Sequence, residues 1–177
     1  MADTDDERYP IGTFQRFEAL PAARERAPLI DAIARAPGDL RRLAGGLGDR
    51  ALEARYRDGG WTIRQVVHHV PDSHMNAYIR MKLAVTESSP AITTYEEQLW
   101  AELADVQQAP VSVSLDLLDA LHHRWVLFLR SLDDDGFVRG YRHPQLGLLP
   151  LYDALALYAW HGRHHVAHVE RALHRNA

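Results

Sequence analysis

Four histidines lie within eight residues near the end of the chain, at positions 161, 164, 165 and 168. Residues four apart share one face of a helix, so His161 with His165, or His164 with His168, could present two imidazoles to one metal ion. A glycine and an arginine follow His161, so the His-Glu-x-x-His pattern of zinc proteases is absent. The cluster therefore predicts a metal site of another kind.

The two histidine pairs occupy different faces of this predicted helix. The face of His161 and His165 continues in residues that suit a core, namely Ala154, Leu157, Tyr158 and Ala172. The face of His164 continues to two arginines, which should point to water. We therefore expect His161 and His165 to be the ligands, His168 to be a neighbouring pocket residue, and His164 to lie outside the site.

A third ligand is available in the segment 62–85, which contains His68, His69 and His74. His69 begins a polar helical face, since the residues three, four, seven and eleven positions later are Asp72, Ser73, Asn76 and Arg80. Such a face suits a polar pocket inside a helical bundle. His68 lies about 100° around the helix and is predicted to be at the surface. Three histidines with an open fourth position are typical of a catalytic zinc site, whereas structural sites use four protein ligands.

Four long helices are needed to position these side chains. Apolar residues recur at spacings of three and four over about 28–43, 62–85, 112–132 and 150–174. Thr62 and Gln65 form a capping-box pattern at the start of the second helix. Pro37 with Gly38 should interrupt the first helix by a kink or a short break, and Pro71 should bend the second near His69 and Val70.

The connections between these helices complete the predicted fold. Residues 86–112 read as a long connection with one short helix near 96–103, and residues 133–147 as a turn-rich segment with a small extended excursion. We predict an all-α four-helix bundle with a long crossover connection. Residues 1–20 are expected to form an N-terminal arm, and residues 21–177 a single domain.

Composition excludes several other classes of function. The chain has 177 residues and no cysteine, so any metal must be held by imidazole, carboxylate or water. The formal net charge of −4 argues against nucleic acid as a partner. No apolar stretch reaches the roughly 20 residues that span a membrane. The acidic start, "MADTDDERYP", is unlike a secretory signal, so we expect a cytoplasmic protein.

The segments "YPIG", "YRDGGWTIRQVVHHVPDSHMNAYIRMKLAVTE", "LHHRW" and "YAWHGRHHVAHV" resemble the YfiT branch of the DinB superfamily, whose members are described as metal-dependent hydrolases. The resemblance covers nearly the whole chain. It implies a DinB-like four-helix bundle, a homodimer, and one divalent ion per chain, zinc or nickel, on His69, His161 and His165. The helical faces indicate the same three histidines.

The site suggests two chemistries. In a hydrolase the ion would activate water towards a small-molecule substrate, with Asp72 or His168 as the general base. Members of this branch and its neighbours also resemble bacillithiol-type thiol S-transferases. In such an enzyme the ion would bind a low-molecular-weight thiol, and Asn76 or Arg80 would position the carboxylates of that thiol. A third interpretation is a bundle without catalytic activity, whose histidines have structural roles or bind only adventitious metal.

Other notable residues are given plainer roles. Packing in the core or at an interface is predicted for Trp61, Trp125, Trp160 and His122. The acidic run at 133–135 is predicted to be a charged turn, because it lacks the spacing of a calcium loop.

Overall fold

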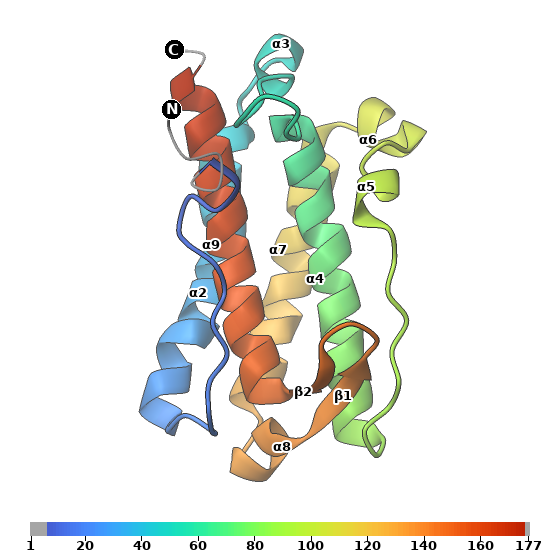
Figure 1. Ribbon diagram of the computed structural model, residues 1–177. Helices are drawn as coiled ribbons and strands as arrows, with labels where there is room; N and C mark the ends of the chain where they lie inside the picture. Colours follow the sequence, from blue (N-terminus) through green and yellow to red (C-terminus); the bar gives the residue numbers. More distant parts are fainter. Residues whose placement is uncertain (1–6, 176–177) are drawn as a thin grey trace.

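The computed structural model describes residues 7–175 and contains four long helices (Figure 1). They are α2 (Ala23–Ala44), α4 (Ile63–Thr86), α7 (Val111–Arg130) and α9 (Leu151–Arg175). α2 and α4 each pack against both α7 and α9, so α2 and α4 occupy opposite corners of the bundle. The fold is therefore the all-α four-helix bundle that the periodicity predicts.

The order of the helices around the bundle requires one long crossover. α2 and α9 run in one direction, and α4 and α7 run in the other (Figure 1). Because α4 and α7 are parallel neighbours, the chain between them returns along the length of the bundle. That crossover carries two short helices, α5 (Glu97–Trp100) and α6 (Ala104–Gln108), where one was predicted near 96–103.

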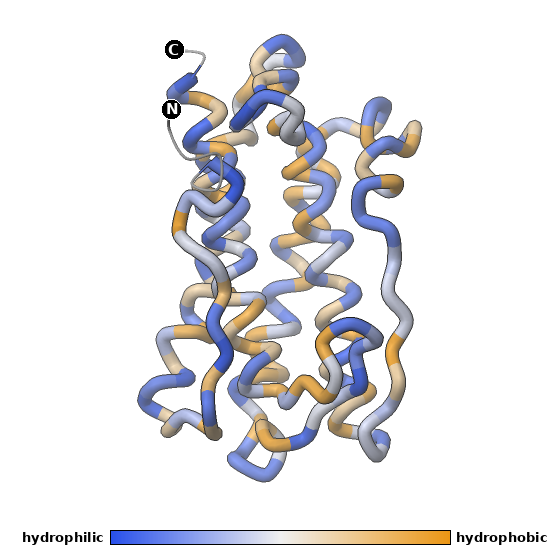
Figure 2. The backbone as a smooth tube through the Cα atoms, in the orientation of Figure 1, coloured by the Kyte–Doolittle hydropathy of each residue, from blue (hydrophilic) through white to orange (hydrophobic). Residues whose placement is uncertain are grey.

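The remaining elements lie at the two ends of the bundle. α3 (Asp49–Leu52) follows α2. α8 (Asp134–Val138) leads into an antiparallel hairpin of β1 (Gly140–His143) and β2 (Gly147–Pro150), in which Tyr141 pairs with Leu149. The hairpin confirms the predicted extended excursion. The loops at the ends of the bundle are largely hydrophilic, whereas apolar residues recur along the helices (Figure 2).

Local sequence correctly predicts the start of α4 but does not predict where α2 begins or that α2 continues past Pro37. The Thr62 side chain accepts a hydrogen bond from the Gln65 amide at 3.1 Å, and the Gln65 side chain accepts one from the Thr62 amide at 3.0 Å, so the predicted capping box is confirmed. α2 begins at Ala23 instead of near Pro28, and it continues through Pro37 without a short break. Pro37 is buried in α2, as are Ile33 and Leu40, and such tertiary packing can maintain a helix past a residue that has no amide hydrogen to donate.

The buried apolar residues form two separate clusters. One, the hairpin-side cluster, includes Ile33, Met81, Trp125, Leu129 and Tyr158. The other, the α3-side cluster, includes Leu40, Val67, Leu115, Leu118 and Val169. Along each long helix the residues between the two clusters include buried histidines or the small residues facing them, so a polar layer crosses the bundle at mid-height.

Residues 7–20 lie along α9 (Figure 1). The Trp160 indole donates a hydrogen bond to the Gly12 carbonyl at 3.0 Å, and the Phe17 amide donates one to Asp153 at 2.9 Å. Positions 1–6 of the expected arm lie outside the described residues. Within residues 7–175, no helix is both long and apolar enough to cross a membrane.

Candidate metal centre

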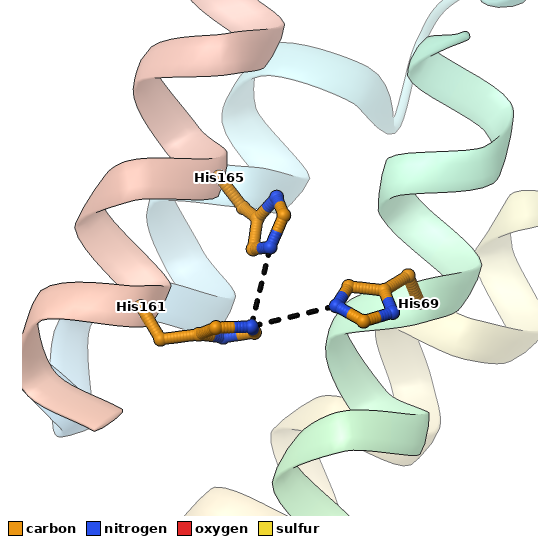
Figure 3. A group of neighbouring side chains, drawn as sticks. All are labelled: His69, His161 and His165. Carbon is orange, nitrogen blue, oxygen red and sulfur yellow. Dashed lines mark hydrogen bonds between the residues drawn. The ribbon is translucent and has the colours of Figure 1, made fainter. Parts of the chain in front are cut away.

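His69 on α4 and His161 and His165 on α9 point toward one another in the middle of the bundle (Figure 3). One ring nitrogen from each lies within 4.8 Å of the other two. The Nε2 atom of His161 is 3.4 Å from Nε2 of His69 and 3.2 Å from Nε2 of His165. The structure thus brings together the three residues that the helical faces select.

Two of the three separations between these nitrogens match those in a tetrahedral metal site. Zinc–nitrogen bonds of about 2.0–2.1 Å in tetrahedral geometry place two ligand nitrogens about 3.3–3.4 Å apart. The separations of 3.4 and 3.2 Å from Nε2 of His161 are close to this value. Three imidazoles would leave at least one coordination position for water or substrate.

Burial makes neutral imidazoles the stable form at this site. It lowers the pKa of His69 to about 4, with a smaller contribution from His168. It also lowers the pKa of His161 and of His165 well below the ordinary value, and neighbouring histidines add to the effect. A neutral imidazole is the form that binds metal, so the three donors are ready near neutral pH.

His168 is fully engaged beside His165. Its Nε2 atom donates a hydrogen bond to the Arg8 carbonyl at 3.0 Å, because a carbonyl can only accept. Its Nδ1 atom must then accept, and it lies 3.4 Å from Nδ1 of His165. The ring also stacks on Tyr56, with centroids 3.8 Å apart. His168 therefore orients His165 and leaves the Nε2 lone pair of His165 directed at the cluster.

Comparison with known proteins identifies the family. Residues 32–169 match the model of the DinB superfamily. The chain belongs to the DinB superfamily. It is 46% identical over 162 residues to YfiT of Bacillus subtilis, covering 91% of this chain and 90% of that protein. It is 49% identical over 166 residues to a protein of Bacillus cereus strain B4264, covering 93% and 94%. The names of both provisionally describe metal-dependent hydrolases.

A solved structure has the same fold as this DinB protein. The structure of YfiT from Bacillus subtilis superimposes with a TM-score of 0.93 at 44% identity, covering 97% of this chain and 98% of that one. It is described as "a probable metal-dependent hydrolase with an unusual four-helix bundle topology". In the present chain, the parallel neighbours α4 and α7 are joined by the long crossover that carries α5 and α6.

The three histidines open onto a cavity of about 310 Å³. Its other walls come from the arm, from the segment before α4, from the crossover and from α9, and include Arg8, Tyr9, Tyr56, Trp61, Glu97 and Trp160. Trp61 lies 4.6 Å from His69 between ring centroids, and its indole donates to Gln98 at 3.0 Å. Trp125 is buried in the core as predicted, but Trp61 and Trp160 line the cavity.

Asp72, Asn76 and Arg80, which were predicted to be a general base or pocket residues, lie in different places relative to the three histidines. Asp72 and Asn76 do not line the cavity, and the Asn76 side chain turns back to donate to the Asp72 carbonyl at 2.9 Å. Burial, aided by Asp105, raises the pKa of Asp72 to about 6. Arg80 lines a second cavity of about 270 Å³, which His161 also lines.

Two histidines expected at the surface are buried, which corrects the sequence analysis. The Nδ1 atom of His68 lies 2.7 Å from the Ser114 hydroxyl, because α7 packs over that face of α4. His164 is 7% exposed and stacks on Trp160, with centroids 4.4 Å apart and the Tyr9 ring at 5.9 Å. The N-terminal arm covers the face of α9 that was expected to meet water.

Sequence reasoning missed Glu97. Among residues 7–175, it is the one acidic residue that lines the cavity of the three histidines. It begins α5 in the crossover, and its side chain is exposed to solvent. The predicted short helix near 96–103 located the segment, but nothing in its spacing showed that it faces the histidines.

Proposed function

We propose that this chain is a metal-dependent hydrolase that holds one divalent ion, zinc or nickel, on His69, His161 and His165. The names of its close relatives and the chemistry of the donor set support this proposal. The observation that carries it is the pair of Nε2 separations, 3.4 and 3.2 Å, at the wall of a cavity large enough for a small substrate. When bound, such an ion acts as a Lewis acid and makes water a nucleophile near neutral pH.

We assign Glu97 as the general base. Its carboxylate lines the same cavity as the three imidazoles, whereas Asp72 does not. Both ring nitrogens of His168 are already occupied, by Arg8 and by His165. In this proposal Glu97 takes the proton from the attacking water as the new C–O bond forms, and returns it to the leaving alcohol or amine as the ester or amide bond breaks. His168 keeps His165 in position. Trp61, whose indole donates a hydrogen bond to Gln98, forms part of the cavity wall.

The test uses protein stripped of metal by chelation and reloaded with zinc or nickel. A panel of small esters and amides should be hydrolysed, and His165→Ala should abolish both metal binding and turnover. Glu97→Gln should lower kcat about 100-fold or more while zinc affinity is unchanged, because general base catalysis typically contributes that much. Glu87→Gln, an exposed carboxylate at the start of the same crossover, is the matched control and should keep full activity. Absence of turnover by fully metallated protein on the whole panel would refute the proposal.

A second candidate, thiol S-transfer, is favoured by Arg80. This arginine is 8% exposed, donates to the Thr93 carbonyl at 2.6 Å, and forms no ion pair with any of the residues 7–175. A buried guanidinium without a carboxylate partner is costly unless a ligand supplies one. It lines the cavity on the other side of His161, where it could bind a carboxylate of a low-molecular-weight thiol.

The two candidates are separated by one assay. Conjugation of an electrophile by the zinc-loaded protein is measured with bacillithiol, glutathione or mycothiol, and without thiol. Product that requires a thiol, with a KM for that thiol raised at least tenfold in Arg80→Gln, would favour transfer over hydrolysis. No conjugation with any of the three thiols would eliminate this candidate.

A further inference from the structure

A series of buried hydrogen bonds leads from the three-histidine cluster to the opposite side of the bundle. The Nδ1 atom of His161 is 2.9 Å from Nε2 of His74, and Nδ1 of His74 is 2.7 Å from Nε2 of His122. The Nδ1 atom of His122 is 2.7 Å from the main-chain carbonyl oxygen of Ile33. These residues belong in turn to α9, α4, α7 and α2, so the series includes all four long helices.

The Ile33 carbonyl oxygen, the last acceptor in this series of hydrogen bonds, determines which ring nitrogen of each histidine carries a proton. A carbonyl oxygen has no hydrogen to give, so Nδ1 of His122 must be the donor to Ile33. A neutral imidazole carries one ring proton, which leaves Nε2 of His122 as an acceptor for His74. By the same reasoning, Nδ1 of His74 is protonated and its Nε2 accepts from His161. At the other end of this series, His161 carries its proton on Nδ1, and its Nε2 atom, without a proton, faces His69 and His165.

The alternative, in which each of the three histidines carries its proton on Nε2, is disfavoured at both ends of the hydrogen-bonded series. It would set the lone pair of His122 Nδ1 against the Ile33 carbonyl at 2.7 Å, and would leave that buried acceptor without a donor. It would also place a proton on Nε2 of His161, the nitrogen that must be bare to bind an ion. His74 and His122 are 0% and 1% exposed, so water cannot relieve the mismatch. Burial lowers the pKa of His122 to about 4, which keeps this ring neutral near pH 7.

We propose that His74 and His122 are positioning residues that hold His161 in the tautomer able to bind metal. We call the hydrogen-bonded series His161, His74, His122 and the Ile33 carbonyl the histidine relay. The Ile33 carbonyl on α2 sets the tautomer of the whole series, because it can only accept a hydrogen bond. Ligand histidines commonly donate their second nitrogen directly to a carboxylate or a carbonyl. In this protein two further histidines carry that constraint from a neighbouring helix. The effect on metal affinity rests on the proposed metal site, whereas the tautomers are a property of the metal-free protein.

The first experiment reads the tautomers directly. Metal-free, 15N-labelled protein at pH 7.5 is studied by two-bond proton–nitrogen correlation, which shows which ring nitrogen of each histidine carries hydrogen. His161, His74 and His122 should each carry it on Nδ1. His123, the exposed neighbour of His122 on α7, is the reference for an unconstrained ring. Hydrogen on Nε2 of His161 would overturn the proposal.

The second experiment links the tautomer to metal binding. His122→Asn retains a donor near the Ile33 carbonyl but removes the acceptor for His74, so His161 should become a mixture of tautomers. Zinc affinity, measured by competition with a chelating dye, should weaken about 10- to 100-fold, the usual effect of losing a group that orients a ligand. His123→Asn, the same change one residue along, should alter neither measurement.

The outcomes separate this proposal from the proposed function. Unchanged zinc affinity and an unchanged His161 tautomer in His122→Asn would refute the relay. If His122→Asn does not fold, the tautomers of the unmodified protein decide the question alone. Neither readout uses turnover, so a protein that hydrolyses nothing could still confirm the relay, and an active hydrolase could still refute it.

Discussion

Mild acid should destabilise the metal-free protein strongly, because its buried histidines must stay neutral. Burial lowers the pKa of His69 and of His122 to about 4, compared with the ordinary value of 6.5 in the unfolded chain. Above pH 6.5 neither state binds these protons. Between pH 6.5 and about 4 the unfolded chain binds them and the folded protein does not, so the free energy of unfolding falls as the pH is lowered.

The size of the effect follows from these pKa values. At pH 5.5 each of the two histidines removes about 1.4 kcal/mol of stability, and at pH 4 each removes about 3 kcal/mol. The pKa values of His74, His161 and His165 are also lowered, well below the ordinary value, so these residues add losses of the same sign. Domains are typically stable by only about 5–15 kcal/mol, so the metal-free protein should unfold between pH 4 and pH 6.

Urea denaturation in the presence of a chelator, followed by circular dichroism at pH 7.5, 6.5 and 5.5, measures this loss. The free energy of unfolding should fall by about 2.8 kcal/mol or more between pH 7.5 and 5.5, since His69 and His122 alone contribute about 1.4 kcal/mol each. His123→Ala, which removes an exposed histidine, should leave the pH dependence unchanged. Saturating zinc should stabilise the protein most at pH 7.5, and progressively less as protons compete for the imidazoles. A free energy of unfolding that is constant within 1 kcal/mol over this range would refute the reasoning.

Two further predictions concern helix packing and helix capping. Gly162→Ala would place a Cβ atom 3.1 Å from the Cβ of Ala36, which has no rotamer to change, so α9 and α2 must separate. We expect a net loss of about 1–3 kcal/mol in urea denaturation together with weaker zinc binding, and a more stable variant would contradict the close approach. Thr62→Ala removes the side-chain cap of α4 and should lower the free energy of unfolding by about 1 kcal/mol. Thr86→Ala, at the last residue of the same helix, is the control and should have a smaller effect.

Local periodicity was sufficient to predict the four helices and the convergence of the three histidines. A helical face is a local property, so the position of His69 among polar residues, and of His161 and His165 among apolar ones, could be recognised from the sequence. The Thr62 and Gln65 cap was predictable for the same reason, because its two hydrogen bonds join residues three apart.

What the sequence did not reveal depends on contacts between distant segments. His164 lies on a face with two arginines, yet the arm covers that face, and Arg171 forms an ion pair with Glu7 at 2.8 Å. Glu97 reaches the cavity because the crossover runs beside α4, which no spacing within the crossover shows. His74 and His122 are 48 residues apart, and their contact exists only after α4 and α7 have packed. The homodimer, the cytoplasmic location and the identity of the metal stay predictions.

The polar layer that divides the apolar core also aligns the helices lengthwise. Helices that contact one another only through apolar side chains can shift along their axes by one turn, about 5.4 Å, and their side chains can still pack together. Imidazole contacts of 2.7–2.9 Å tolerate no such slip, and they join α9 to α4, α4 to α7, and α7 to α2. The contacts of His161, His74 and His122 therefore fix the lengthwise alignment of all four helices. A helix displaced along its axis would lose these contacts together with the convergence of the three histidines.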